Sequence, residues 1–446
     1  MTLRQTRRTL LKQIAVAGAT MPWISPRLVR AVSPNGKLRH VSFGANGMAW
    51  SDINSLSRNK NWELIAAVDV DMKRFGKLDE KFPKTTKYQD WREVFDKHVD
   101  EFDSCNVTVP DHSHAPIAMT ALNHDKHVYC QKPLCHDLYE VRKLTEAAAA
   151  KPKLATQMGI QIHSSAYYRL GVALIHSGAI GKVKEVHTFS HKKWGDMSPK
   201  PDKSDPVPDN LNWDVWLGVC SKRPFIGGGY YHPGNWRKRL DFGTGTFGDM
   251  GCHIYDPVFE ALALTYPLKI TSRGPEPGDY NWSINSHIEY VFPGTQYTAG
   301  DTVNVTWYDG DARPPQAIQQ LVEGRKVPNQ GSIFIGTEGV MLLPHVERPF
   351  LYPLAKFADY KFPKVEGSDH WGQFVDAALG QGQTLAPFSY SGPLTEAVIM
   401  GGVACRFKGK TLHWDGAGLK FTNEPKANDF VRKPYREGWD VPGLTT

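Results

Sequence analysis

The chain has 446 residues, which is enough for two domains with separate hydrophobic cores. Its formal net charge is +7, but residues 1–30 contain six of the basic residues and no acidic one, so the remaining chain carries only +1. Binding to nucleic acid or to an anionic membrane needs clustered excess charge, and a nearly neutral body argues against both classes of partner. Beyond residue 30 no apolar run approaches the length of a transmembrane helix, so we also expect no membrane span.

The first residues have the order of an export signal. Residues 6–12 read TRRTLLK, and a weakly apolar stretch from Ile14 to Ile24 follows. This order resembles a twin-arginine signal, with a disordered basic N-terminus as the alternative. We therefore expect residues 1–35 to be a signal and linker. The same interpretation implies transient contact with the twin-arginine export machinery and a periplasmic or otherwise exported mature protein.

The six cysteines are arranged neither as a metal site nor as a disulfide framework. They lack paired C-x-x-C spacing and accompanying histidines. We expect buried free thiols and no bound metal, with a disulfide formed after export as the open alternative.

From residue 37 short apolar runs alternate with helical stretches, which is typical of a parallel βαβ sheet. In chain order, we expect strand 38–43, helix 48–58, strand 63–68, helices 72–81 and 90–97, strand 103–109, helix 116–123, strand 127–130, helix 138–150 and strand 154–157. Residues 36–157 are therefore predicted to form an α/β Rossmann domain that binds a dinucleotide.

After residue 159 the loops lengthen and alternating strands appear, for example at 183–190, 286–291, 302–307 and 332–335. This pattern predicts an α+β domain over residues 158–407 with a large, mostly antiparallel open sheet, which serves substrate binding and oligomerisation. A last helix is expected at 392–407. Residues 408–446 form a polar tail that either wraps the body or is partly disordered.

A glycine-rich turn follows the first expected strand. Gly44 takes the place of the first glycine of a dinucleotide turn, whereas Asn46 stands where the second glycine normally lies. Asparagine tolerates a positive φ better than most residues, so the bend stays feasible. Gly47 adds freedom to the backbone next to it. The residues expected to form this turn are Gly44, Ala45, Asn46, Gly47 and Met48.

An acid at the end of the second expected strand supports the dinucleotide interpretation. Asp69 follows Gly44 near the spacing at which a carboxylate accepts hydrogen bonds from the adenosine ribose. It would repel a 2′-phosphate, which favours NAD over NADP, and Arg74 partly offsets that preference. The alternative is that Asp69 only caps the next helix.

Residues 106–137 read NVTVPDHSHAPIAMTALNHDKHVYCQKPLCHD. This segment resembles the Gfo/Idh/MocA oxidoreductase superfamily, which includes glucose-fructose oxidoreductase and inositol dehydrogenases. The family's T-P-x-x-x-H segment is matched loosely by residues 109–114 and its E-K-P motif by residues 131–133, and the match continues over 154–174 and 245–253. The resemblance adds four residues to the expected cofactor site: Pro110, His114, Gln131 and Lys132.

Oxidation of a sugar hydroxyl requires a proton acceptor, a positive charge near the oxygen and a nicotinamide to take the hydride. Lys132 follows a parallel strand, where α/β sheets bind ligands. Asp249 and His253 are four residues apart and share a face if the segment is helical, although Pro257 complicates that helix. The resemblance assigns the same residues, so we expect His253 as proton acceptor, Lys132 as electrostatic stabiliser and Asp249 as the residue that positions them.

Gln131 is the clearest departure from the family pattern, which has glutamate at this position. A neutral amide keeps its hydrogen-bonding capacity but removes a negative charge near the cofactor. Dinucleotide binding stays plausible, while cofactor affinity and redox direction are left open.

Aromatic and basic residues gather between positions 191 and 237. Aromatic faces pack against sugar rings, and polar groups bind their hydroxyls. We expect the substrate wall here, with core packing as the alternative for any one of its members. The expected contacts are Lys193, Trp194, Tyr231, His232 and Trp236.

The sequence thus predicts an NAD(P)-dependent oxidoreductase that transfers hydride between a nicotinamide and a carbohydrate or polyol. Because no free NAD pool exists outside the cytoplasm, an exported enzyme should hold its NAD tightly. One alternative is a glycoside hydrolase or lyase that retains NAD and oxidises the sugar only transiently. Another is a non-catalytic sugar-binding protein. The resemblance also implies a homo-oligomer.

Overall fold

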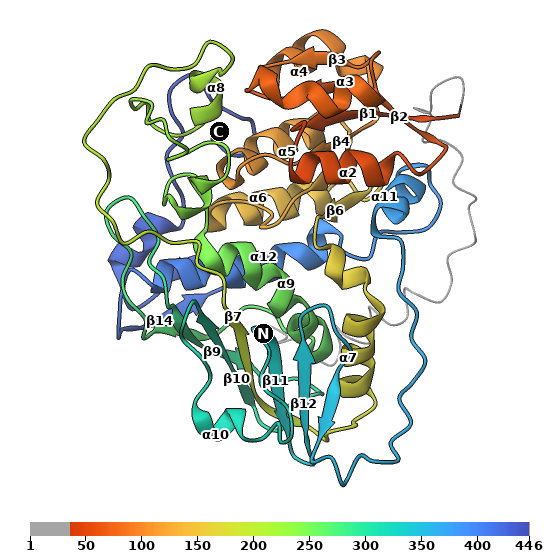
Figure 1. The fold of residues 1–446 in the computed structure, drawn as a ribbon, viewed down its shortest axis with the longest axis vertical. Coiled ribbons are helices and arrows are strands. Elements are labelled where there is room, and N and C mark those ends of the chain that lie inside the picture. Colours follow the sequence, from red (N-terminus) through yellow and green to blue (C-terminus); the bar gives the residue numbers. More distant parts are fainter. Residues whose placement is uncertain (1–35, 446) are drawn as a thin grey trace, which may run out of the picture.

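Residues 36–445 are described by a computed structural model, in which the first third of the chain forms a parallel sheet (Figure 1). The expected export signal at residues 1–35 lies outside the described residues. The sheet has the order β3-β2-β1-β4-β5-β6. Its strands are β1 (Leu38–Phe43), β2 (Trp62–Val68), β3 (Thr86–Tyr88), β4 (Ser104–Val107), β5 (His127–Cys130) and β6 (Thr156–Met158). The strand order reverses between β1 and β4, and ligands of doubly wound folds bind at such a switch point.

The helices of this unit lie where the apolar periodicity predicts them. They are α2 (Met48–Leu56), η1 (Met72–Phe75), α3 (Gly76–Lys81), α4 (Arg92–His98), η2 (Val99–Glu101), η3 (Asp111–Ser113), α5 (His114–Asn123) and α6 (Leu138–Ala149). The expected helix at 72–81 is thus a 3-10 turn followed by a short α-helix. Helix α6 begins with a capping box, in which Asp137 accepts a hydrogen bond from the Glu140 amide.

The second sheet is the large, mostly antiparallel sheet that the sequence predicts, with the order β13-β12-β11-β7-β10-β9-β8-β14-β15. Only the pairing of β7 with β10 is parallel among its described ladders. Its strands are β7 (Val183–Ser190), β8 (Lys269–Ser272), β9 (His287–Pro293), β10 (Thr302–Asp309), β11 (Gln330–Gly336), β12 (Val340–Pro344), β13 (Phe350–Tyr352), β14 (Thr411–Asp415) and β15 (Lys420–Phe421).

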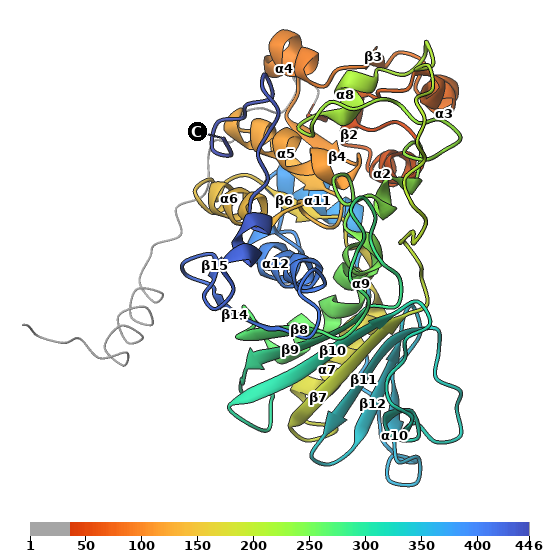
Figure 2. The same ribbon diagram turned by 90° about the vertical axis from the view of Figure 1, so that its left-hand side faces the viewer.

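Two long helices lie between the two sheets, as Figures 1 and 2 show. Helix α9 (Gly245–Leu262) continues through Pro257, so Asp249 and His253 do lie one turn apart on one helix. Helix α12 (Phe388–Ala404) packs against α6 and α9. The remaining helices are η4 (Gln161–Ser164), α7 (Ala166–His176), α8 (Trp213–Leu217), η5 (Asn235–Lys238), α10 (Gln316–Gln319), α11 (His370–Ala378) and η6 (Pro425–Phe430).

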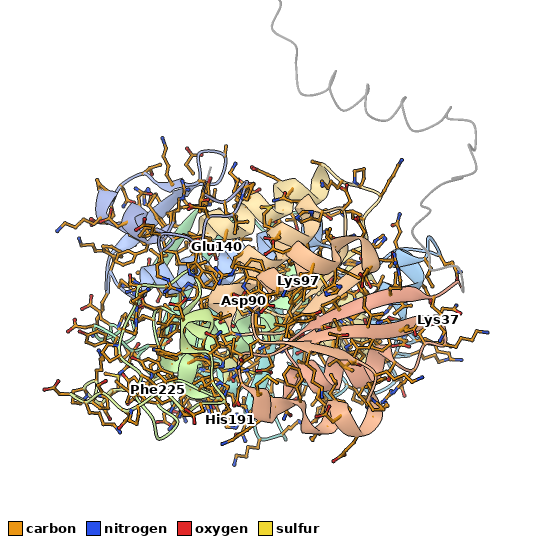
Figure 3. All side chains as sticks on the ribbon, turned by 90° about the horizontal axis from the view of Figure 1, so that it is seen from above. Lys37, Asp90, Lys97, Glu140, His191 and Phe225 are labelled. Carbon is orange, nitrogen blue, oxygen red and sulfur yellow. The ribbon has the colours of Figure 1, made fainter. Side chains whose placement is uncertain are left out.

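The end of the chain returns to the parallel-sheet unit. Helix α11 packs against α2, and its Phe374 and Val375 are fully buried. The tail wraps the body rather than leaving it: the Tyr435 hydroxyl donates to Glu140 at 2.8 Å, and Arg92 stacks on Trp439 at 4.2 Å. In the view from above, Glu140 lies beside the C-terminal segment (Figure 3).

All six cysteines are buried and free, as their spacing predicts. Within residues 36–445, none of the helices has both the length and the apolar character needed to cross a bilayer. Only the described part of the chain bears on that finding.

A buried ion pair fastens the parallel-sheet unit to the helices beneath it. Arg142 on α6 donates to both carboxylate oxygens of Glu396 on α12, at 2.7 and 2.9 Å, and to the Gly416 carbonyl at 2.9 Å. The Glu396 side chain is 2% exposed. A bidentate pair of this kind adds geometric specificity to the packing of α6 on α12.

Arg142→Met should lower the free energy of unfolding by about 3–5 kcal/mol, because it leaves a buried carboxylate without its partner. Urea unfolding followed by circular dichroism measures the loss. The double variant Arg142→Met/Glu396→Met is the control, and it should recover most of the stability because no buried charge is left. If the double variant were no more stable than the single one, the loss would come from packing rather than from the charge.

Candidate active site

A cleft with a volume of about 390 Å³ lies between the carboxyl ends of the parallel strands and helix α9. Most of the expected site residues line it together: Gly44, Asn46, Gly47, Met48, Asp69, Arg74, Pro110, His114, Gln131, Lys132, His232, Trp236, Asp249 and His253. Ala45, Lys193, Trp194 and Tyr231 are not part of the lining. The two sequence motifs that carry chemistry therefore meet at one site, although Lys132 and Asp249 are far apart in the chain.

The turn from β1 into α2 has the backbone of a phosphate cradle. Gly44 has a φ of 108°, and a side-chain carbon there would collide with the Thr108 carbonyl. The second positive φ is at Gly47 (61°) and not at Asn46, whose side chain instead accepts a hydrogen bond from the Gly47 amide at 2.7 Å. Gly47 is also the N-cap of α2 and makes no side-chain cap, so the first amides of the helix are free to bind an anion.

Asp69 lines the cleft at the end of β2, where an adenosine ribose is expected. Its carboxylate accepts hydrogen bonds from the amides of Ala45 and Asp71, both at 3.1 Å. The alternative, that Asp69 caps the next helix, is wrong, because the N-cap of η1 is Asp71, which accepts from the Lys73 amide. Asp69 thus holds the glycine turn in place and faces the ligand site.

These features fit a dinucleotide cofactor. A cradle that a Cβ at Gly44 would fill, uncapped amides at the start of α2 and a carboxylate at the end of β2 match the pyrophosphate and ribose of such a cofactor. Arg74 lies beside Gly47, where its guanidinium also faces the phosphate position.

The amide of Gln131 contacts a buried acid that the motif search did not single out. Gln131 Nε2 donates to Asp52 on α2 at 3.0 Å, and the same carboxylate accepts from Thr108 at 2.8 Å and from the Trp371 indole at 2.9 Å. Burial raises the pKa of Asp52 to about 6, against the opposing effect of these donors. The family's glutamate is replaced by Gln131, and the nearest carboxylate is instead that of Asp52, which contacts the Gln131 amide.

Lys132 and Asp249 form the centre of the site. Lys132 Nζ donates to the Asp249 carbonyl at 2.8 Å and to its Oδ1 at 2.7 Å. Arg237 Nε approaches the same Oδ1 at 3.4 Å. Burial alone would raise the pKa of Asp249, but the charges of Lys132 and Arg237 outweigh it and hold that pKa well below its usual range. Asp249 is therefore ionised.

His253 lies one turn after Asp249 on α9. Its Nδ1 is enclosed and has no hydrogen-bond partner among the described residues, while the ring lines the cleft. Burial, together with the positive charge of Lys132, lowers the pKa of His253 well below the usual value. The imidazole is therefore neutral and able to accept a proton.

The expected substrate wall is only partly at the cleft. Trp236 and His232 line it, and His232 pairs with Asp71 at 2.9 Å, on the dinucleotide side. Lys193 is outside the lining and pairs with Asp311 at 2.7 Å, because its long side chain is directed to solvent. Tyr231 is 2% exposed and packs with Trp213, Trp216 and Phe242.

Trp194 stacks against Arg237. Arg237 lies in the aromatic and basic segment but was not among the expected substrate contacts. Arg237 and Trp216 both line the cleft. For Arg237 the available signal was its position directly after Trp236, since guanidinium groups stack on aromatic rings.

The chain belongs to the Gfo/Idh/MocA oxidoreductase family. Residues 38–159 match the family's NAD-binding Rossmann fold, and residues 175–297 match its C-terminal alpha/beta domain. The resemblance that the motifs carry and the fold that the alternating elements predict are both confirmed.

Curated relatives match shorter parts of the chain. A glucose-6-phosphate 3-dehydrogenase from Bacillus subtilis is 27% identical over 149 residues, which are 33% of this chain and 41% of that protein. An inositol 2-dehydrogenase from Salmonella typhimurium is 29% identical over 127 residues, 28% of this chain and 37% of that protein. A levoglucosan dehydrogenase from Pseudarthrobacter phenanthrenivorans is 24% identical over 229 residues, which are 50% of this chain and 47% of that protein. The chain thus spans less than half the length of each of these relatives.

Solved structures match over most of the chain. The WlbA dehydrogenase from Bordetella pertussis, in complex with NADH and UDP-GlcNAcA, gives a TM-score of 0.60 at 11% identity and covers 85% of this chain and 99% of its own. An aldose-aldose oxidoreductase from Caulobacter crescentus, complexed with glycerol, gives 0.54 at 14% identity, with 85% and 100% covered. At these identities the likeness shows a shared fold.

The stability of the protein should depend on pH through Asp52. Its folded-state pKa of about 6 lies above the unfolded value, so the folded state favours the protonated acid and loses stability as pH rises from 4 to 6. Between those values the native chain should lose about 2 kcal/mol more than Asp52→Asn. Urea unfolding at both pH values measures this, and parallel losses in the two proteins would contradict the shifted pKa.

Proposed function

We propose that this chain is a sugar oxidoreductase that transfers hydride between NAD and a hydroxyl-bearing carbon of a carbohydrate or polyol. The observation that carries the proposal is the Lys132–Asp249 pair beside a neutral His253, in the same cleft as the dinucleotide turn. Three relatives that match part of the chain act on a sugar phosphate, an inositol and an anhydrosugar by their names, which supports a hydroxylated substrate.

The catalytic groups divide the work on a substrate hydroxyl. Bound NAD supplies the hydride acceptor at the cleft. Lys132 donates two hydrogen bonds to Asp249. Its third N–H is left to stabilise the substrate oxygen as negative charge develops there. His253 accepts the hydroxyl proton at Nε2, the ring nitrogen that is not enclosed. Asp249 positions the ammonium through its carboxylate and its carbonyl.

NAD rather than NADP is the proposed cofactor, because the carboxylate of Asp69 faces the ribose position and disfavours a 2′-phosphate there. Tight retention of the cofactor is supported by the segment before α8, which closes over the end of β2. Leu211 forms a β-bridge with Asp71, the Met72 amide donates to the Asn210 carbonyl at 2.9 Å, and His232 pairs with Asp71.

Export by the twin-arginine route belongs to the same proposal, since a protein that leaves the cytoplasm folded carries its nucleotide with it. We also propose that copies of the chain associate, as the family resemblance implies. A redox-neutral variant of the reaction, in which the sugar is oxidised, cleaved by elimination and reduced again, uses the same three residues. Retained NAD favours it, because no external electron acceptor is then needed.

Lys132→Ala should reduce turnover by about 10²–10³-fold, because removing one preorganised donor has that effect on charge stabilisation. The assay follows the reduced-nicotinamide absorbance of the purified protein while neutral sugars, polyols and aryl glycosides are added. Lys238→Ala is the matched control, since Lys238 is close in the chain to Trp236 but does not line the cleft. Undiminished turnover in Lys132→Ala would remove the assigned role.

The same assay separates the candidate functions. Growth of the reduced-nicotinamide band with a sugar supports the dehydrogenase, and glycoside cleavage without a lasting change in the band supports the redox-neutral reaction. A protein that contains no nucleotide when purified, and binds none when nucleotide is added, would contradict both functions.

The pH profile of kcat/KM should show an acid limb below the ordinary histidine pKa of about 6.5. The pKa of His253 is lowered by burial and by Lys132, so the imidazole stays neutral at pH values where a free histidine is already protonated. Steady-state rates between about pH 5 and 8 test this. A limb centred near the ordinary value would show that another group accepts the proton.

A further inference from the structure

Arg237 has hydrogen-bonding capacity that the protein itself does not use. The residue belongs to η5 and lines the cleft with a side chain that is 30% exposed. Its Nε makes one long contact, 3.4 Å to Asp249 Oδ1. Neither of its two terminal nitrogens has a partner among the residues that the structure describes. A side chain that lines the cleft therefore has four N–H donors without an acceptor among the described residues.

The position of the guanidinium is fixed by aromatic rings. Its carbon lies 4.3 Å from the ring centre of Trp236 and 5.4 Å from that of Trp194. Stacking of this kind orients the fork before a ligand arrives, so little conformational entropy is lost on binding. Arg237 is thus a preorganised site and not a mobile surface arginine.

Arg237 shares its one acidic partner with a second cation. Lys132 and Arg237 share the single carboxylate of Asp249, where both contact Oδ1. The next acid in their field, Asp111, is 4% exposed beneath Thr244, which donates to it at 2.7 Å. Burial raises the pKa of Asp111, which disfavours a charge there. A negative charge on the substrate would give Arg237 an acceptor that it does not share with Lys132.

We propose that Arg237 binds a carboxylate on the substrate, so that the preferred sugar is an acidic one such as a hexuronate. The inference rests on the proposed function, because it names the substrate class of that site. A carboxylate matches the planar fork with two parallel hydrogen bonds and supplies the negative charge that pairs with it. A phosphate monoester carries nearly two negative charges. The phosphates of the cofactor are expected at the Gly44–Met48 turn and Arg74, on the dinucleotide side of the cleft.

Calorimetry on the nucleotide-loaded protein tests the proposal with matched pairs of sugars. Glucuronate and galacturonate differ from glucose and galactose only in the carboxylate. The native protein should bind each acid at least tenfold more tightly than its neutral parent. Arg237→Gln should bind each acid no more tightly than its neutral parent. Arg237→Lys should retain part of the difference, because it keeps the charge but not the fork.

Lys238→Gln is the control for a general loss of positive charge, since Lys238 is the next residue along the chain and lies outside the lining. Thermal unfolding of each variant verifies that it is folded. Equal affinity for acid and neutral sugars in the native protein would overturn the inference, as would a preference that survives in Arg237→Gln. Tighter binding of glucose 6-phosphate than of glucuronate would show that the site prefers a phosphate to a carboxylate, and it would also reject the inference.

Failure of this inference is distinguishable from failure of the proposed function. Nucleotide reduction by glucose or inositol, without any preference for the acids, would keep the oxidoreductase and reject the acidic substrate. Calorimetry measures carboxylate binding whether or not hydride is transferred, so the role of Arg237 is decided by binding alone.

Discussion

The contact between Lys132 and Asp249 is the constraint on which the candidate site depends, because it joins the two halves of the molecule at the cleft. Lys132 follows β5 of the parallel sheet, and Asp249 lies on α9, which packs beneath it. An ammonium and a carboxylate that are both mostly buried tolerate little separation, since either one alone would be an uncompensated charge. The ion pair between α6 and α12 joins the parallel-sheet unit to the helices beneath it at a second point, away from the cleft.

Local patterns were sufficient to predict most of the fold. Strands β1 and β5 lie where short, mostly apolar runs indicate, because they are almost wholly buried, and β7 lies where alternation indicates. Strand β3 was missed since it is very short, partly exposed and at the edge of its sheet. The pairing of β14 with β8 joins segments that are far apart in the chain, and no local pattern reports such a pairing.

The candidate site was predicted where a motif places chemistry at a strand or helix end, as for Gly44, Lys132 and Asp249. It was not predicted where function comes from long-range contacts. Asp52 is one acid on an otherwise apolar helix face, and its importance depends on Trp371, which belongs to a distant part of the chain. Tyr231 shows the converse, because it belongs to a cluster whose residue types are typical of a sugar-binding wall, yet its side chain is buried in the core. Residue type indicates what a side chain can do, whereas packing decides whether a ligand can reach it.

The return of the chain's end to its beginning has a consequence for biosynthesis. Helix α11 supplies the indole that supports Asp52, and the tail beyond it covers α6 and α4. The nucleotide-binding unit is therefore incomplete while the ribosome is still making the last part of the protein. Helix α11 is synthesised only after strands β1 to β13. The packing seen around the nucleotide-binding unit can therefore form only late in synthesis, once α11 and the tail have been made.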